Sequence, residues 1–214
     1  MDFSTCTQEY LENTFDLEPI FIPSALNEWL NSALPLTEQE RYEANELQEM
    51  LILNIGHWNE QELSLHFIGP IFSMPKFTIV KKMNIFAQRF ISATVIDTAN
   101  NPVLLSGRPD GMLASGYRSP NTPLFCFQEY KREKDPHGDP AGQCLAAMLV
   151  GQTLNNSMDE VIYGCYVVGE NWRFMALQKK KYAISPAFSA ATDEVYFIIG
   201  VLKQLKQLIL ARLS

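Results

Sequence analysis

The stretch that decides the fold runs from Gly107 to Gln143 and has the sequence GRPDGMLASGYRSPNTPLFCFQEYKREKDPHGDPAGQ. Asp110 follows one apolar run, and Glu129 and Lys131 stand two positions apart at the end of another. The chain has no other Pro-Asp pair and no other triplet in which an acidic residue precedes a lysine by two positions. These two half-motifs are therefore not selected from many equivalent candidates.

The residue types in this stretch suit the hydrolysis of a phosphodiester bond. That reaction needs an activated water, neutralisation of charge on the phosphate oxygens, and stabilisation of the departing alkoxide. Magnesium supplies much of this, and it takes oxygen ligands from one or two protein carboxylates. We expect Asp110 and Glu129 to lie on neighbouring strands and to provide these ligands. Because residues two apart in a strand face the same way, Lys131 is expected to project beside Glu129.

With these motifs the chain resembles the PD-(D/E)XK nuclease superfamily, whose members have a restriction-endonuclease-like fold. Pro109-Asp110 matches the first half of the family motif, and Glu129-Tyr130-Lys131 matches the second half. The resemblance implies that Asp110, Glu129 and the carbonyl of Tyr130 bind Mg²⁺ or Mn²⁺, and that Lys131 orients or activates water. It implies a metal-dependent nuclease that hydrolyses DNA, and it covers roughly residues 59 to 180.

Two further site residues follow from the same resemblance. Many members place a glutamate on the helix before the first strand. Glu60 is favoured for that role over Glu62, because Glu62 has a competing role as the acid of a capping box. Some members carry a glutamine on the helix after the Glu-x-Lys triplet, which Gln143 matches, whereas Ala147 replaces the tyrosine that follows it in RecB-like nucleases. The chain is also similar to a group of uncharacterised bacterial proteins within the superfamily.

The sequence predicts an α/β fold with a mixed sheet, organised as the αβββαβ core of the family with helices on both faces. Residues 1–35 contain acids, aromatic residues and prolines without a sustained period. We expect them to form a helical arm, with a short helix near Ser24 to Asn31, packed on a single nuclease domain of residues 36–214. A long C-terminal helix completes the domain.

Helix boundaries are marked by capping residues. Thr37 with Glu40, and Asn59 with Glu62, form two capping boxes, and Asp139 before Pro140 starts a third helix. The helices are expected from Thr37 to about Asn54, from Asn59 to a stop at Gly69-Pro70, from Asp139 through Leu154, and from a cap at Thr192 to the C-terminal end.

Strands are expected where β-branched and aromatic residues gather. The predicted strand regions are Phe77 to Val80, Asn84 to Ile96, Val103 to Ser106 continuing into Gly111 to Ser115, Leu124 to Lys131, and a hairpin of Val161 to Val168 and Trp172 to Leu177. The strand at Leu124 is apolar on both faces at its start, which is typical of a central strand.

The composition agrees with a folded protein but argues against a simple polyanion binder. The chain has 214 residues, of which 47% are hydrophobic, and a formal net charge of −7. Most non-specific affinity for nucleic acid comes from neutralised phosphates, so this acidity lowers the expectation of DNA binding. The acids gather in the first 62 residues, however, while a basic set lies later and is expected to contact a nucleic-acid backbone: Arg132, Lys134, Lys179, Lys180 and Lys181.

The sequence also bears on location and assembly. We expect a cytoplasmic protein with no membrane partner, because no apolar stretch approaches the ~20 residues of a membrane span and the cysteines lie far apart, mostly in apolar segments. The apolar belt on the C-terminal helix is too wide for packing on one side alone. It is buried either on this domain's own sheet or in a homodimer.

Three alternatives to the active nuclease stay open. The chain could be a catalytically inactive binding or interaction module that has kept the nuclease fold. Asp110 and Lys131 could form a structural salt bridge. A glycosidase that uses Asp110 and Glu129 as its two carboxylates is the third alternative, but it leaves Lys131 without a role.

Overall fold

The computed structural model describes residues 1–21, 25–121, 123–131 and 138–213, and it describes residues 123–131 by their backbone alone. Over these residues the chain has a mixed α/β fold, as the sequence predicts. The helices are α1 (Gln8–Phe15), α2 (Ala25–Asn31), α3 (Glu38–Asn54), α4 (Glu60–Leu63), α5 (Gly69–Ser73), α6 (Pro140–Leu154) and α7 (Glu194–Arg212), with a 3-10 helix η1 (Phe3–Thr5) and a π-helix η2 (Ser64–Ile68). The strands are β1 (Glu18–Pro19), β2 (Met83–Ala87), β3 (Ile91–Ile96), β4 (Pro102–Gly107), β5 (Gly111–Ser115), β6 (Pro123–Lys131), β7 (Ile162–Val168), β8 (Asn171–Gln178), β9 (Lys181–Ile184) and β10 (Phe188–Ser189).

The main sheet has the strand order β1-β9-β8-β7-β6-β5-β2, and β10 pairs with β8. Strand β6 lies between β5, to which it is antiparallel, and β7, to which it is parallel. A parallel pair needs a crossover connection, and α6 supplies it between β6 and β7. Strands β3 and β4 form a separate two-stranded ribbon. The central position that the sequence predicts for β6 is confirmed.

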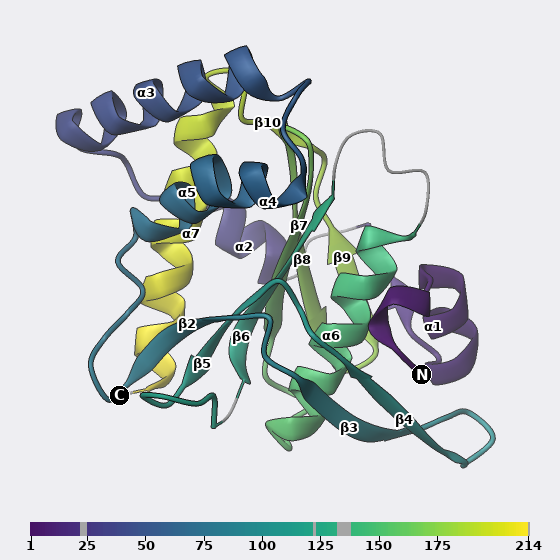
Figure 1. The fold of residues 1–214 in the computed structure, drawn as a ribbon. Coiled ribbons are helices and arrows are strands. Elements are labelled where there is room, and N and C mark those ends of the chain that lie inside the picture. The colour runs from purple at the N-terminus through teal and green to yellow at the C-terminus, as the bar shows by residue number, and fades with distance from the viewer. Residues whose placement is uncertain (22–24, 122, 132–137, 214) are drawn as a thin grey trace.

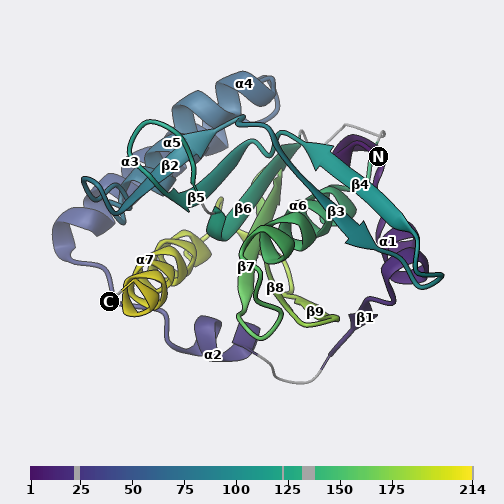
Figure 2. The ribbon, with the colours of Figure 1, turned by 90° about the horizontal axis from the view of Figure 1, so that it is seen from below.

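Helices cover both faces of the sheet. Helices α2, α3, α5 and α7 lie on one face, and α6 with α1 and the β3–β4 ribbon lies on the other (Figures 1 and 2). Each face has its own apolar cluster, because successive strand residues point to opposite sides. Helix α6 is buried all along residues 141–152, since the sheet lies on one side of it and the ribbon and α1 lie on others.

The N-terminal arm is bound to the rest of the chain at several points. Strand β1 pairs in parallel with β9, and the indole nitrogen of Trp29 in α2 donates to the carbonyl of Val201 in α7 at 2.8 Å. The chain before α1 crosses the start of α6 so closely that a Cβ on Gly142 would lie 2.6 Å from the carbonyl oxygen of Cys6. Only glycine leaves room for this crossing.

Most of the expected helices are confirmed. Helix α2 begins and ends within the expected range, α3 has the capping box of Thr37 and Glu40, and α6 starts after Asp139 with Pro140 in its first turn. The hairpin of β7 and β8 is also confirmed. Helix α1 was not expected from the sequence, although Thr7 caps it by accepting a hydrogen bond from the Tyr10 amide.

Three boundary predictions are wrong. Gly69-Pro70 does not stop the helix. The Gly69 amide donates to the Ser64 carbonyl in a π-helical turn. Pro70 lies in the first turn of α5, where its missing N–H is not needed. Phe77 to Val80 does not form a strand, and only an isolated bridge joins Ile79 to Met83. The cap of α7 is Asp193 rather than Thr192, although the Thr192 hydroxyl accepts from the Glu194 amide at 3.3 Å.

A fourth correction concerns the run from Asn84 to Ile96. It forms two strands in different sheets, β2 and β3, because the backbone bends at residues 88–90. At the bend Gln88 has a φ of 49°, in the left-handed region that residues other than glycine rarely adopt. Neither glycine nor proline marks this bend in the sequence.

The apolar belt of α7 is covered largely by this chain itself. Its buried residues are Val195, Ile198, Ile199, Gly200, Val201, Leu202, Leu205 and Ile209. All of these except Gly200 belong to the same apolar cluster as Trp29, Leu51 and Phe72 from α2, α3 and α5. Burial on its own domain therefore accounts for most of the belt, and a homodimer through α7 is not needed to explain it.

Other expectations concern thiols and membranes. Cys6, Cys144 and Cys165 are buried, in keeping with thiols that act as small apolar residues, and Cys126 lies among the side chains outside the description. Burial raises the pKa of the Cys6 thiol to about 11. No helix in the described ranges is both long and apolar enough to span a bilayer.

Candidate metal-binding pocket at the sheet corner

The candidate site lies where two chain segments bend together from the main sheet into the β3–β4 ribbon. The pairing of β2 with β5 ends at Ala87 and Gly111, and the pairing of β3 with β4 begins at Ile91 and Gly107. Residues 88–90 and 108–110 connect these pairs and form a corner that we call the sheet corner. The Gln88 amide donates to the Asp110 carbonyl at 3.2 Å, so the two segments are hydrogen-bonded at the bend.

A pocket of about 510 Å³ opens at this corner. It brings together Glu60 from the start of α4 and Asp110 from the Pro-Asp motif, although fifty residues of chain separate them. Asp110 is half-buried and follows the buried Pro109, whereas Glu60 is exposed. The remaining lining residues offer amide, hydroxyl or small groups: Gln61, Ser64, Ala87 and Gln88.

The structure separates the two glutamates that compete for the helix position. The Glu62 carboxylate accepts from the Asn59 amide at 2.8 Å, and the Asn59 side chain accepts from the Glu62 amide at 2.9 Å, which is the predicted capping box. Glu62 is not among the residues that line the pocket, and Glu60 is. Because the capping box orients the first turn of α4, Glu62 helps to hold the position of Glu60.

Glu129 and Lys131 are placed through the backbone of β6. In the antiparallel ladder Gly111 pairs with Gln128, and Met112 pairs with Phe127. If this register continued by one more residue, position 110 would stand opposite position 129. On its other side β6 pairs Glu129 with Tyr166 and Lys131 with Val168 of β7. The two half-motifs therefore meet at the same end of the sheet.

Gln143 does not line the pocket. It is buried in the first turn of α6, and 6% of its surface is exposed. Its amide nitrogen lies against Gly138, where a Cβ would come within 2.8 Å of it, and Gly138 has a φ of 124°. Both features require glycine at position 138, just before α6. Gln143 thus lies at the loop that follows β6, apart from the pair of Glu60 and Asp110.

The expected backbone-binding lysines lie elsewhere. Lys179 and Lys180 form the turn between β8 and β9, and Lys181 begins β9. Because β8 starts opposite Val168 and runs back along β7, this turn is at the far end of the sheet from Lys131, roughly 25 Å away over eight residues of strand. We call this end the lysine end. Arg132 and Lys134, the other two residues of the basic set, lie outside the described residues.

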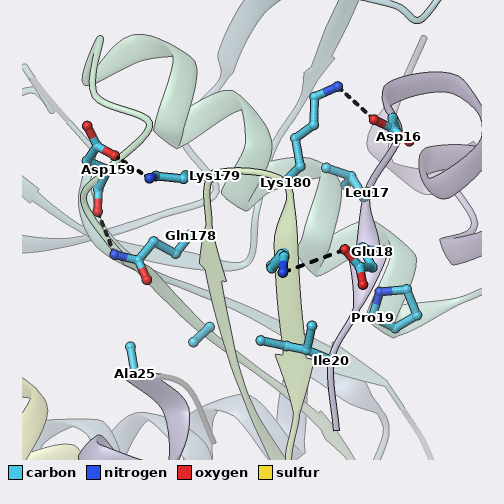
Figure 3. Close-up of a pocket in the computed structure, with 12 residues that line it drawn as sticks. Asp16, Leu17, Glu18, Pro19, Ile20, Ala25, Asp159, Gln178, Lys179 and Lys180 are labelled. Atoms are coloured by element: carbon cyan, nitrogen blue, oxygen red, sulfur yellow. Dashed lines mark hydrogen bonds and ion pairs between the residues drawn. The ribbon is translucent and has the colours of Figure 1, made fainter. Parts of the chain in front are cut away.

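Each lysine at the lysine end faces a carboxylate. Lys179 pairs with Asp159 at 3.1 Å, Lys180 with Asp16 at 3.0 Å and Lys181 with Glu18 at 3.9 Å. Figure 3 shows Lys179 and Lys180 turned to acids on opposite sides of the β8–β9 hairpin. These residues line a pocket of about 720 Å³ between the hairpin and the arm, larger than the pocket at the sheet corner. Its rim carries balanced charges.

Sequence reasoning missed several pocket residues. Gln61 and Ser64 follow Glu60 on the same helical stretch, and Gln88 lies at the bend after β2. The signal for Gln88 was present, because Gln88 and Arg89 are two polar residues in an otherwise β-like run. Such an interruption marks a bend or an irregular backbone position.

Comparison with known proteins found no family model and no curated protein that matches this sequence. Within the described residues no group of three or more His, Cys, Asp or Glu side chains is placed to hold a metal ion. Glu60 and Asp110 supply two carboxylates at one pocket, and the side chain of Glu129 lies outside the description.

Proposed function

We propose that this protein is a metal-dependent nuclease that hydrolyses phosphodiester bonds of DNA, with a restriction-endonuclease-like core. The order of α4 and α5, then β2, β5 and β6, then α6 and β7 follows the expected αβββαβ arrangement, with the β3–β4 ribbon inserted between β2 and β5. This order supports the proposal, since the Pro-Asp motif directly precedes β5 and the Glu-x-Lys motif ends β6, the strand that pairs with β5.

One observation carries the proposal. Glu60 and Asp110 come from separate parts of the chain, were each expected at a metal site, and line the same pocket. Asp110 of that pocket lies one residue beyond Gly111, which pairs with Gln128 of β6. Carboxylate oxygens that line one pocket are the ligand type that a hard divalent cation prefers.

The donor set fits a hard divalent cation. Carboxylates of Asp110, Glu129 and Glu60 and the carbonyl of Tyr130 would hold Mg²⁺ or Mn²⁺, which prefer oxygen ligands and retain several waters. Such an ion, when bound, acidifies a coordinated water and neutralises charge on the phosphate oxygens. The remaining polar groups at the pocket are neutral amides and hydroxyls, which leave room for water and for phosphate oxygens.

The other residues have roles in positioning and proton transfer. Lys131 orients the attacking water and offers positive charge to the scissile phosphate. Asp110 is fixed by the preceding Pro109, which is buried, and by the backbone hydrogen bond from Gln88. Gln143 packs against Gly138, directly before α6.

The test is cleavage of supercoiled and linear DNA in the presence of Mg²⁺ or Mn²⁺. We expect the wild-type protein to nick or degrade DNA, and Lys131→Ala to abolish this activity while the thermal unfolding curve stays unchanged. Lys179→Ala is the matched control, because it removes a lysine at the other end of the sheet. Equal activity in wild type and Lys131→Ala would rule out the assignment.

Calorimetry distinguishes the inactive interaction module. If neither Mg²⁺ nor Mn²⁺ binds in a manner that depends on Asp110 and Glu129, the chain has kept the fold without the metal site. Binding that both Asp110→Asn and Glu129→Gln remove supports the nuclease even where the natural substrate is not yet identified.

A further inference from the structure

Beside the candidate pocket, an aromatic ring and a guanidinium group are exposed together. Phe90 has 56% of its surface exposed, and the guanidinium carbon of Arg108 lies 5.8 Å from the centre of its ring. Both residues belong to the sheet corner, since Phe90 follows Gln88 by two positions and Arg108 precedes Asp110 by two. The pair therefore belongs to the same backbone bend that contributes Gln88 and Asp110 to the pocket.

The bend fixes the pair relative to the pocket. A guanidinium nitrogen of Arg108 donates to the Gln88 carbonyl at 3.2 Å, and the Gln88 amide donates to the Asp110 carbonyl at 3.2 Å. Gln88 and Asp110 both line the pocket. Arg108 is thus bonded to a residue of the pocket wall while its charge stays at the surface, where it is exposed.

An exposed phenylalanine beside a guanidinium has the chemistry of a stacking platform. The face of an aromatic ring stacks on nucleobases irrespective of their identity, and arginine adds charge for the phosphate and a planar group of its own. Bases within a duplex already stack on one another, so such a platform is available only to an unpaired nucleotide. A lone exposed phenylalanine would need no explanation, but this one adjoins two carboxylates at a pocket.

We propose that Phe90 and Arg108 bind an unpaired nucleotide of single-stranded DNA next to the scissile phosphate. The inference rests on the proposed nuclease function and names its substrate class: DNA with a single-stranded segment or a frayed end. The base stacks on Phe90, Arg108 contacts a phosphate, and the neighbouring phosphodiester lies over the pocket of Glu60 and Asp110.

The chain offers a matched control for this pair. Tyr117 is 59% exposed, and the guanidinium carbon of Arg118 lies 5.9 Å from the centre of its ring. This second pair follows β5, whereas Arg108 precedes it, so the two pairs are at opposite ends of a five-residue strand. Tyr117→Ala and Arg118→Gln therefore remove the same chemistry at a distance from the pocket.

The experiment measures binding of labelled oligothymidine by fluorescence anisotropy in EDTA, which separates binding from cleavage. Loss of one base–aromatic stack is expected to weaken binding by roughly 5- to 150-fold in Phe90→Ala. Phe90→Trp should retain the affinity. Arg108→Gln should lower both the affinity and its dependence on salt. The control variants Tyr117→Ala and Arg118→Gln should bind as the wild type does. A strand that carries 2-aminopurine reports stacking directly, because its fluorescence rises when the stack is lost.

The outcomes separate this inference from the nuclease proposal. If Lys131→Ala abolishes cleavage but Phe90→Ala binds and cleaves single strands like the wild type, the platform is wrong and the nuclease stands. If the protein cleaves no DNA but Phe90→Ala specifically loses oligothymidine, the nuclease is wrong and the binding site stands. The proposed platform is also wrong if Phe90→Ala and Tyr117→Ala lose the same affinity for oligothymidine. It is wrong, too, if Phe90→Ala loses as much affinity for blunt duplex as for oligothymidine.

Discussion

The two ends of the central sheet handle charge in opposite ways. At the lysine end each of three lysines pairs with a carboxylate, and two of these acids, Asp16 and Glu18, belong to the N-terminal arm. At the sheet corner two carboxylates, Glu60 and Asp110, line one pocket together. Two of the lysine pairs attach the arm at the lysine end, whereas the carboxylates at the corner belong to a pocket wall. The larger of these two cavities is at the lysine end.

The difference also bears on an inference from composition. A run of three lysines in an acidic chain suggests a surface for phosphates. Exposed ion pairs contribute little to stability, but they cancel the local potential that would attract a polyanion. At the corner the described cations are Arg89 and Arg108, both exposed, which fits contact with phosphates near the pocket better than the lysine run does.

The largest expected effect is on the cleavage rate, which the same substitution of aspartate by asparagine should change at the sheet corner but not at the lysine end. Asp110→Asn should lower metal-dependent cleavage by at least ~100-fold, because a metal ion contributes several kcal/mol to transition-state stabilisation. Asp159→Asn removes an acid of the same type at the lysine end, where its side chain is 84% exposed, and should leave the rate unchanged. The measurement is the initial rate of plasmid nicking in Mn²⁺. Similar losses in both variants would show that the corner has no special role.

A smaller effect is expected on metal binding, and it distinguishes Glu60 from Glu62, which lie in the same turn of helix. Glu60→Gln should weaken Mn²⁺ binding by ~10-fold or more without change in thermal stability, since the side chain is exposed and only lines the pocket. Glu62→Ala removes the capping box and should cost about 0.5–2 kcal/mol of stability. Calorimetry and urea unfolding report the two quantities independently. A larger loss of metal binding in Glu62→Ala than in Glu60→Gln would reverse the assignment.

The sequence predicted those parts of the fold whose signals are local. The caps at Thr37, Asn59 and Asp139 each start a helix, and the hairpin of β7 and β8 turns at Gly169, whose φ of 62° suits glycine. The caps and the hairpin turn depend on a few neighbouring residues, so spacing and residue type were sufficient to predict them. Asp110 and Glu60 are distant in the chain and line a common pocket, and their role as metal ligands stays a prediction.

The unpredicted parts depend on distant segments. Strands β1 and β9 pair across more than 160 residues of chain, and each is too short to show a period of its own. The bend at Gln88 has no glycine or proline, because backbone pairing on both sides holds the residue in its left-handed conformation. The lysine run could not be assigned to the arm from sequence, since its partners Asp16 and Glu18 belong to a segment without clear periodicity.

The smallest effect concerns how the lysine end holds the arm. The buried Tyr182 of β9 donates to the Glu12 carboxylate at 2.5 Å and accepts from the Gln8 side chain at 3.0 Å, and both partners belong to α1. Tyr182→Phe should therefore lower the free energy of unfolding by about 1 kcal/mol at neutral pH, with cleavage at the corner unaffected. Tyr117→Phe is the control, because it alters an exposed ring and should leave the free energy of unfolding unchanged.

The pH dependence of that difference tests its origin. Burial, with the hydrogen bond to Glu12, raises the pKa of Tyr182 to about 12 from an ordinary value of 10.0. The unfolded chain then loses this proton first as the pH rises, so the contribution of Tyr182 is complete below about pH 10 and is lost towards pH 12. Urea unfolding at about pH 8 and about pH 11 should show the gap between wild type and Tyr182→Phe becoming smaller at the higher pH. A gap that stays constant would mean that the hydroxyl contributes by packing alone and that the arm is held by β1 and the lysine pairs.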